Sequence, residues 1–382
     1  MIRTMIFIIV LINFIACNPE NPENQEGDLD STSMSTDMNA GSSTADDDGT
    51  QPTAGDTDTG DTGNAGDTSD TEEDPVERNL NCEEIPSWYG ESPPIAETPN
   101  ITTADGQILR MNWDDYERYY AIALPENYNP DIPAPMIIHF HGGNNTIQGT
   151  VMKRQWLIDR ARAEGFIYVI PQGLAKVWNA THCCGAPFYC DEDDVGAVEA
   201  MVNVLGSSIA VDLDRVYATG HSNGGMFSHR IAVELPNLFA AVAPGASSIG
   251  GKPKNSLTDE IIRLEPTNNP IPILLYHGKR DGSVKFGGGV SGPPEEQTPN
   301  SRIDLSFDES TAYWLEANGC SDNPTTTREG SATIKEYTCS EAPVTTLVFN
   351  ELGHSYPDPD DVTDFDFGEI LFRFFNTHRR GE

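Results

Sequence analysis

Residues 215–230 read Arg-Val-Tyr-Ala-Thr-Gly-His-Ser-Asn-Gly-Gly-Met-Phe-Ser-His-Arg, with Ser222 at the centre of a Gly-His-Ser-Asn-Gly motif. The β-branched and aromatic run at 216–219 predicts a buried strand, and apolar residues after position 225 recur at helical spacing. A strand, Gly-x-Ser-x-Gly and a helix in this order are typical of a nucleophile elbow, where a sharp turn lifts the serine hydroxyl above a sheet edge. The alternative is an ordinary strand-to-helix turn, because the motif alone is weakly specific.

Strands and helices are predicted to alternate on both sides of this motif. Strands are expected at 119–124, 136–140, 166–170, 216–219, 238–243, 271–276 and 345–349. Helices are expected at 153–164, 195–209, 226–235, 310–318 and 367–377. Such alternation predicts an α/β fold with a mostly parallel central sheet that is covered by helices on both faces.

A glycine-rich turn, His141-Gly142-Gly143-Asn144, follows the predicted strand 136–140. Glycines let the backbone approach a substrate closely, so an N–H near Gly143 or Asn144 is predicted to act together with the N–H of Asn223. Two such donors form an oxyanion hole, in which each contributes about 3 kcal/mol to stabilising a tetrahedral intermediate. The alternative is a turn that needs glycine only for its backbone conformation.

Two further residues complete a candidate set for nucleophilic catalysis. Asp281 follows the predicted strand 271–276, and His354 follows the last predicted strand. The chain order Ser, Asp, His is that of an α/β-hydrolase triad, in which the imidazole moves the serine proton and the carboxylate orients the ring. Asp304 and Asp308 are the alternatives for the acid. His139, His141, His221 and His277 are expected to be structural, hydrogen-bonded groups at strand ends.

A longer series of motifs now points to one family. The motifs occur in this order: His141-Gly142-Gly143, Pro171-Gln172-Gly173-Leu174, Trp178-Asn179, Cys183-Cys184-Gly185, Asp193-Asp194-Val195-Gly196, the Ser222 motif, His277-Gly278 with Asp281, Asn318-Gly319-Cys320 and Gly353-His354-Ser355. Together they resemble the polyhydroxybutyrate depolymerase and feruloyl esterase family of secreted α/β-hydrolases, over roughly residues 112–377. The resemblance implies an α/β-hydrolase fold and a serine esterase with Ser222, Asp281 and His354 as its triad.

The chain departs from the family pattern at Tyr356, where the family usually has Trp, and at residues 282–286. Both places are expected to flank the substrate cleft, so they leave the substrate open. Trp178 and Trp156 are candidates for an aromatic or sugar-binding platform, with burial in the core as the alternative. We take Trp178 and Tyr356 as the predicted substrate contacts.

The resemblance predicts an exported esterase that acts on polymeric or oligomeric esters through an acyl-enzyme. Feruloyl or acetyl groups on plant polysaccharide and polyhydroxyalkanoate oligomers are the expected substrates. Two alternatives stay open: a serine peptidase, because a triad does not distinguish esters from amides, and an inactive surface binding protein on a hydrolase scaffold. No cofactor is expected, because the triad supplies both nucleophile and proton transfer.

The 382 residues divide into three parts. Residues 1–17 resemble a bacterial lipoprotein signal that ends at a lipidated Cys17, with secretion without a lipid as the alternative. Residues 18–81 are an acidic Asp, Thr, Gly and Ser segment that is predicted to be a disordered linker, because it has almost nothing to bury. Residues 82–382 are the predicted catalytic domain. We expect a monomer that contacts a membrane only through its lipid.

Charge and cysteine content limit the partners further. The formal net charge of −37 makes nucleic acid a poor partner for this surface. With Cys17 lipidated, six cysteines remain for three disulfides in an exported protein. Cys320 is expected to pair with Cys339, and Cys82 with one of Cys183, Cys184 and Cys190, the other two pairing with each other.

Two metal sites are weaker alternatives. His182 with the neighbouring cysteines could bind zinc, although an oxidising compartment favours disulfides over free thiolates. The carboxylates between Asp358 and Asp366 could bind calcium, although a solvated loop is the simpler interpretation. The acidic run 191–194 is expected to cap the helix that follows it. We therefore predict no metal.

Overall fold

A computed structural model describes residues 107–113, 116–266, 269–292, 295 and 297–381. The predicted signal 1–17, Cys17, the linker 18–81 and Cys82 lie outside these residues, so the statements about them remain predictions. None of the helices in the described ranges combines the length and the apolar content needed to cross a bilayer.

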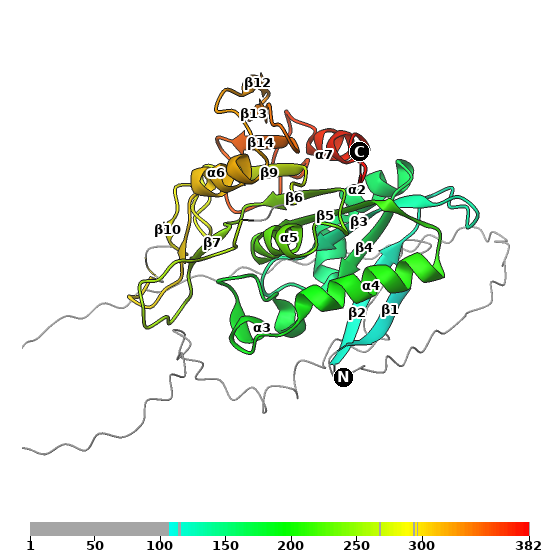
Figure 1. The fold of residues 1–382 in the computed structure, drawn as a ribbon, viewed down its shortest axis with the longest axis horizontal. Coiled ribbons are helices and arrows are strands. Elements are labelled where there is room, and N and C mark those ends of the chain that lie inside the picture. The colour runs from blue at the N-terminus through cyan, green and yellow to red at the C-terminus, as the bar shows by residue number, and fades with distance from the viewer. Residues whose placement is uncertain (1–106, 114–115, 267–268, 293–294, 296, 382) are drawn as a thin grey trace, which may run out of the picture. The chain divides into compact units, whose positions relative to one another are not determined.

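One large sheet forms the centre of the domain, with the strand order β1-β2-β4-β3-β5-β6-β9-β14-β13-β12 (Figure 1). The pairs from β4 to β14 are parallel, and the pairs at both edges are antiparallel. The bounds are β1 Gln107–Trp113, β2 Tyr116–Ala123, β3 Ala134–Phe140, β4 Ile167–Pro171, β5 Val211–His221, β6 Ala241–Gly245, β9 Ile273–Gly278, β12 Thr325–Glu329, β13 Ala332–Tyr337 and β14 Val344–Phe349.

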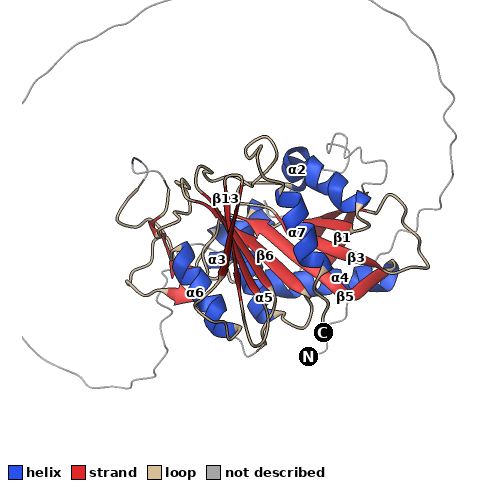
Figure 2. Ribbon diagram, turned by 90° about the horizontal axis from the view of Figure 1, so that it is seen from above, coloured by secondary structure: helices blue, strands red, loops and turns tan. Residues whose placement is uncertain are grey.

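Helices cover both faces of this sheet (Figure 2). Apolar residues of α4 (Asp194–Ser208), α5 (Asn223–Glu234) and α6 (Phe307–Ala317) share one core cluster, and those of α2 (Ile147–Ala163) and α7 (Phe367–Asn376) share another. Strand β3 shows why: Met136 and Ile138 belong to the first cluster, and Ile137 belongs to the second. Neighbouring side chains on a strand point to opposite faces of the sheet, so a continuously apolar strand contributes side chains to the core on each face. The predicted mostly parallel α/β architecture is confirmed.

A second, smaller sheet has the order β10-β11-β7-β8. Its antiparallel strands are β7 Gly250–Lys252, β8 Ile262–Arg263, β10 Gly289–Val290 and β11 Ile303–Asp304. The segments that form it follow β6 and β9 in the chain. Two short helical segments, η2 Leu174–Lys176 and α3 Gly185–Tyr189, lie in the connection from β4 to α4.

The predicted elements are present, with shifted ends. Helix α2 begins at Ile147, before the predicted 153–164, because Thr146 caps it by accepting a hydrogen bond from the N–H of Gly149 at 3.1 Å. The strand predicted at 238–243 begins only at Ala241, because the N–H of Leu238 closes a turn on the carbonyl of Leu235 at 2.9 Å. The edge strands β1, β12 and β13 and the small sheet were not predicted.

Candidate active site

The Ser222 motif forms a sharp junction between β5 and α5. Ser222 has φ 59° and ψ −126°, a left-handed backbone that is unusual for a residue with a side chain. Its N–H donates to the carbonyl of Gly245 at 3.0 Å, which holds the turn against β6. A Cβ at Gly220 would collide with the carbonyl of Gly224, and a Cβ at Gly224 would collide with the carbonyl of Phe140. The two glycines are therefore required by close backbone packing, as the elbow interpretation expects.

The three predicted triad residues lie within hydrogen-bonding distance of one another. Ser222 Oγ is 2.9 Å from His354 Nε2, and His354 Nδ1 is 2.7 Å from Asp281 Oδ2. The three follow β5, β9 and β14, which are parallel strands whose carboxyl ends share one edge of the sheet. The Asp281 side chain is fully buried, whereas 23% of the His354 side chain is exposed. The His354 imidazole can thus exchange protons with a bound molecule, while the Asp281 carboxylate stays shielded from solvent.

Asp281 is held by four donors. One oxygen accepts the N–H groups of Ser283 at 2.8 Å and Val284 at 2.9 Å, and the other accepts His354 and His277 Nε2, the latter at 3.1 Å. Burial raises the pKa of Asp281, but the hydrogen bonds and charges of His277 and His354 outweigh it and bring the pKa below its usual value. The carboxylate is therefore ionised at neutral pH and fixed in orientation.

His277 is a partner of Asp281 that the sequence did not reveal. Its Nε2 also lies 2.9 Å from the carbonyl of Val284, so Nε2 carries a proton and donates. Its Nδ1 is buried and has no hydrogen-bond partner among the described residues, and the Phe286 and Phe307 rings lie nearly perpendicular to the imidazole. The sequence placed His277 in a motif shortly before Asp281 and predicted a structural, hydrogen-bonded role, which the structure shows, but it did not indicate Asp281 as the partner.

The loop after β3 reaches the elbow. A Cβ built on Gly142 would lie 3.5 Å from the Cβ of Ser222, and one built on Gly143 would lie 3.9 Å from the Cβ of Asn223. Within the described ranges, the N–H groups of Gly143, Asn144 and Asn223 have no acceptor. Asn144 has φ 59°, so the loop turns sharply at this residue. The two segments predicted to form an oxyanion hole are therefore adjacent.

His141 fixes the orientation of this loop. Its Nε2 accepts the N–H of Gly173 at 3.0 Å, which leaves the proton on Nδ1 to donate to the carbonyl of Gly142 at 2.8 Å. Burial lowers the pKa of His141 to about 4, so the ring is neutral. The Gly142 carbonyl and the Gly143 N–H belong to one planar peptide and point in opposite directions. Because His141 holds the Gly142 carbonyl, it also sets the direction of the Gly143 N–H. The predicted structural role of His141 is confirmed.

His139 and His221 also lie beside the site. His139 Nδ1 is 2.6 Å from the hydroxyl of Tyr168, as expected of a structural histidine, and burial lowers its pKa to about 3. His221 differs from the expectation, because its buried Nε2 has no hydrogen-bond partner in the described part of the chain. Its ring instead packs against the His354 ring, with 4.7 Å between centroids. His221 thus limits the positions that the exposed imidazole can adopt.

The two predicted substrate contacts are core residues, and this prediction is wrong. Trp178 is 2% exposed and its ring stacks on Phe227, with 5.0 Å between centroids. Tyr356 is fully buried, and its hydroxyl lies 3.3 Å from the hydroxyl of Thr219. Neither side chain can reach a molecule bound at Ser222 without leaving the core. The alternative of buried packing applies to Trp178, and Tyr356 fills the same kind of position.

Four of the described cysteines form two pairs at disulfide distance, and the full set of three disulfides stays a prediction. Cys183 lies at disulfide distance from its neighbour Cys184, and Cys320 from Cys339. Cys190 is also in a disulfide. Bonded sulfurs of Cys183 and Cys184 cannot act as thiolate ligands, so the zinc alternative at His182 has no support here.

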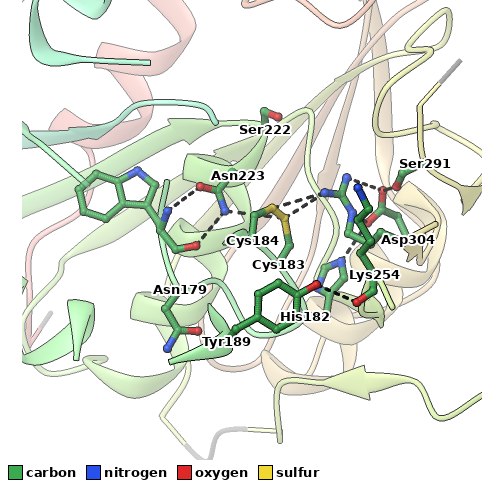
Figure 3. Close-up of a disulfide and its surroundings, with 12 residues drawn as sticks. Asn179, His182, Cys183, Cys184, Tyr189, Ser222, Asn223, Lys254, Ser291 and Asp304 are labelled. Atoms are coloured by element: carbon green, nitrogen blue, oxygen red, sulfur yellow. Dashed lines mark hydrogen bonds and ion pairs between the residues drawn. A yellow bond between two sulfur atoms is a disulfide. The ribbon is translucent and has the colours of Figure 1, made fainter. Parts of the chain in front are cut away.

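The disulfide of Cys183 and Cys184 lies between the elbow and a buried charged cluster (Figure 3). On one side, Asn223 Nδ2 lies 3.9 Å from Cys183 Sγ. On the other, Arg302 Nη1 lies 2.9 Å from the same sulfur, and its guanidinium binds both oxygens of Asp304. Asp304 also accepts His182 Nε2 at 2.9 Å and the hydroxyl of Ser291. Asp304, the alternative acid, is therefore engaged away from Ser222.

The acidic segments have protein partners. Asp193 caps α4 by accepting the N–H of Gly196 at 2.8 Å, as predicted. Between residues 358 and 366, Asp358 pairs with Arg154 at 3.2 Å, and Asp366 caps α7 through the N–H of Glu369 at 2.9 Å. Within the described part of the chain, no three His, Cys, Asp or Glu side chains are arranged to hold a metal ion. The calcium alternative therefore gains no support.

The arrangement can carry out acyl transfer. It offers a hydroxyl bonded to an imidazole, an ionised carboxylate bonded to the same ring, and backbone N–H groups free to bind an oxyanion. These are the parts that nucleophilic attack on a carbonyl requires.

Comparisons with known proteins were made for the whole chain. No family model matches it. Feruloyl esterase B of Piromyces equi is 27% identical over 217 residues, which are 54% of this chain and 37% of that protein. Feruloyl esterase C of Emericella nidulans is 28% identical over 205 residues, which are 52% of this chain and 66% of that protein. The chain thus spans less than two thirds of the length of either relative.

A solved structure supports the fold. Native sOPH matches with a TM-score of 0.51 and 14% identity, over 74% of this chain and 90% of that one. With the strand order and the positions of the three side chains at strand ends, this likeness confirms the predicted α/β-hydrolase fold. The resemblance to feruloyl esterases is likewise confirmed, whereas that to polyhydroxybutyrate depolymerases stays a prediction.

Proposed function

Because this chain is a relative of the feruloyl esterases with an α/β-hydrolase fold, we propose that it is a carboxylic ester hydrolase that uses Ser222 as its nucleophile. The observation that carries the proposal is the continuous hydrogen-bond chain from Ser222 Oγ through His354, at 2.9 Å, to Asp281, at 2.7 Å. A serine hydroxyl is a weak nucleophile unless an adjacent base takes its proton, and His354 is that base.

The reaction has two halves. Ser222 Oγ attacks the ester carbonyl carbon while His354 Nε2 takes the hydroxyl proton, and the carbonyl oxygen becomes an oxyanion bound by the N–H groups of Asn223 and of Gly143 or Asn144. The intermediate collapses, the C–O bond to the alcohol breaks, and His354 returns the proton to the alcohol. Water then repeats the sequence on the acyl-enzyme and releases the acid. Asp281 keeps the ring oriented and stabilises its cationic form.

The substrate class follows from the relatives that the chain resembles. Both compared relatives are named feruloyl esterases, which favours hydroxycinnamoyl esters of plant polysaccharide. Acetyl esters and polyhydroxyalkanoate oligomers complete the candidate set. We propose that the enzyme is exported and works as a monomer, tethered to a membrane through a lipid on Cys17 and the acidic segment 18–81. Export also fits the paired cysteines.

A direct test compares the purified chain with its Ser222→Ala variant on p-nitrophenyl acetate. Loss of the nucleophile should lower kcat by about 10⁵-fold or more. Equal rates in the two proteins would remove the proposal, and absence of turnover in both would favour a binding protein on a hydrolase scaffold. Hydrolysis of a peptide p-nitroanilide at a higher kcat/KM than any ester would favour a peptidase. Methyl ferulate against a hydroxybutyrate trimer then separates the two ester classes.

A further inference from the structure

The two segments that would form the oxyanion hole come from distant parts of the chain, and a single buried residue is hydrogen-bonded to both, through its indole on one side and its backbone on the other. We propose that Trp178 is a positioning residue that sets the spacing between the Asn223 N–H and the loop carrying Gly143 and Asn144. The proposal rests on the proposed esterase function and adds a residue that the triad does not include.

The first link joins Trp178 to the loop after β3. The indole Nε1–H donates to the carbonyl of His141 at 2.9 Å. That carbonyl belongs to the peptide directly before the one that carries the Gly143 N–H, and the next carbonyl, that of Gly142, is held by the His141 ring. Gly224 of the elbow also lies against the His141 carbonyl, because a Cβ there would collide with it. The indole therefore fixes the loop at its closest approach to the elbow.

The second link joins Trp178 to the start of α5. The backbone N–H of Trp178 donates to Asn223 Oδ1 at 2.7 Å, and Asn223 Nδ2 donates to the carbonyl of Trp178 at 3.1 Å. Two opposed hydrogen bonds between one amide and one residue's backbone define both distance and orientation. Asn223 therefore has two separate uses: its backbone N–H faces the reaction, and its side chain clamps Trp178.

The ring contacts reinforce the same two segments. The indole stacks on Phe227 of α5 at 5.0 Å with 9° between planes, and the edge of Phe140 at the end of β3 meets it at 5.3 Å and 82°. Trp178 is 2% exposed, and buried side chains are generally close-packed, so a shift of the ring would displace its neighbours. Moving this side chain would move the two donor segments relative to each other.

Donor spacing matters because an oxyanion hole works only when both N–H groups lie about 2.7–3.1 Å from the oxygen that develops charge. Loss of one donor costs about 10²–10³-fold in kcat, and a 1 Å displacement costs about 10²-fold. Loosening the spacing without removing a donor should cost less, so we expect about tenfold.

The test is Trp178→Phe, which keeps an apolar ring and removes the indole N–H. The matched control is Trp314→Phe: Trp314 is also fully buried and also donates its indole N–H, to His229 Nδ1 at 2.9 Å, but it does not contact the loop. Two quantities are measured on folded protein: kcat/KM for p-nitrophenyl acetate, and the inhibition constant of benzeneboronic acid. The boronate binds Ser222 Oγ covalently as a tetrahedral anion and places an oxygen in the hole, so its affinity reports donor spacing.

We expect W178F to lose about tenfold in both quantities and W314F to lose less than twofold in either. A second variant, Asn223→Ala, keeps the backbone N–H but releases Trp178, and it should show the same paired loss. If W178F does not fold, the measurements on N223A alone test the proposal.

The proposal is overturned if W178F, or N223A in its place, stays within twofold of the control in boronate affinity. A loss confined to thermal stability would leave Trp178 as an ordinary core residue. If S222A retained the wild-type rate, the esterase proposal itself would fail. If S222A abolished the activity but W178F kept the wild-type kcat/KM and boronate affinity, only the positioning role of Trp178 would be removed.

Discussion

The His354–Asp281 and His182–Asp304 pairs have similar hydrogen-bond distances. His354 Nδ1 is 2.7 Å from Asp281, and His182 Nε2 is 2.9 Å from Asp304. Each carboxylate is fully buried and has a second partner, His277 in the first pair and Arg302 in the second. For both aspartates, burial raises the pKa, but the histidine and its companion outweigh burial and bring the pKa below its usual value.

The pairs differ at the nitrogen that does not face the carboxylate. His354 is 23% exposed and presents its other nitrogen to Ser222 Oγ, whereas His182 is fully buried and its Nδ1 has no partner within the described ranges. His182 and Asp304 join the connection before α3 to the small sheet, across 122 positions of sequence. A histidine–aspartate pair is therefore a structural link by default, and it becomes a candidate for proton transfer only when a nucleophile and solvent reach the second nitrogen.

The largest expected effect comes from exchanging each aspartate for asparagine. Asp281→Asn should lower kcat about 10⁴-fold with little change in fold, because an amide cannot stabilise the imidazolium and favours the wrong tautomer. Asp304→Asn should leave kcat per folded molecule unchanged. Its free energy of unfolding should fall by about 3 kcal/mol, because the Arg302 charge loses its carboxylate. Ester hydrolysis and chemical denaturation measure the two effects.

The distinction between the two pairs would be wrong if D281N and D304N had the same effect on kcat. A folded D304N protein that has lost most of its kcat would make Asp304 the acid, the alternative that the sequence left open. Circular dichroism of both variants under the assay conditions supplies the control.

A smaller effect is expected from the companion of the first pair. His277→Phe removes one donor from Asp281 but leaves the two N–H groups of Ser283 and Val284, so the carboxylate stays in place with more freedom. We expect kcat to fall about tenfold, a size typical of lost positioning rather than lost chemistry. His277→Gln, which can still donate, is the matched variant and should recover most of the rate. Equal losses in both would indicate a packing role beside Phe286 and Phe307 instead.

The contrast between the pairs also separates what sequence can predict from what it cannot. Ser222, Asp281 and His354 each follow a predicted parallel strand, so their meeting at one sheet edge could be expected. The pairing of His182 with Asp304 could not, because Asp304 lies in a two-residue strand with no periodic pattern. Trp178 shows the same limit. From sequence, an aromatic residue near a motif can equally be a substrate-binding platform or a buried core residue, and only the tertiary packing distinguishes the two.

Strand prediction failed for a related reason. The residues of β12, Thr-Thr-Thr-Arg-Glu, are exposed throughout, so they carry no alternation of apolar and polar side chains. The strand exists because its backbone pairs with β13. Such pairing depends on a neighbour in space and leaves no local signal in the sequence.

The smallest expected effect tests whether His182 is neutral in the folded protein. Burial lowers the pKa of His182 more than its hydrogen bond to Asp304 raises it, and the charge of Arg302 lowers it further. Above pH 6.5 neither folded nor unfolded His182 binds a proton, and stability does not depend on it. Below pH 6.5 the unfolded chain binds a proton at His182 more readily than the folded protein does, so the free energy of unfolding decreases as the pH is lowered, by at most about 1.4 kcal/mol per pH unit.

His182→Gln removes this dependence while keeping a donor to Asp304. Between pH 6.5 and 5, the slope of the free energy of unfolding against pH should therefore become shallower in the variant, by at most one proton, measured by urea denaturation at each pH. Part of the slope should remain, because burial also lowers the pKa of His139 and of His229 to about 3. If His182 were instead a cation paired with Asp304, its pKa would be raised, and its contribution would be present below pH 6.5 and lost above it. The substitution would then leave the slope between pH 6.5 and 5 unchanged and alter it only above pH 6.5, and the second pair would be an ion pair rather than a neutral hydrogen-bonded link.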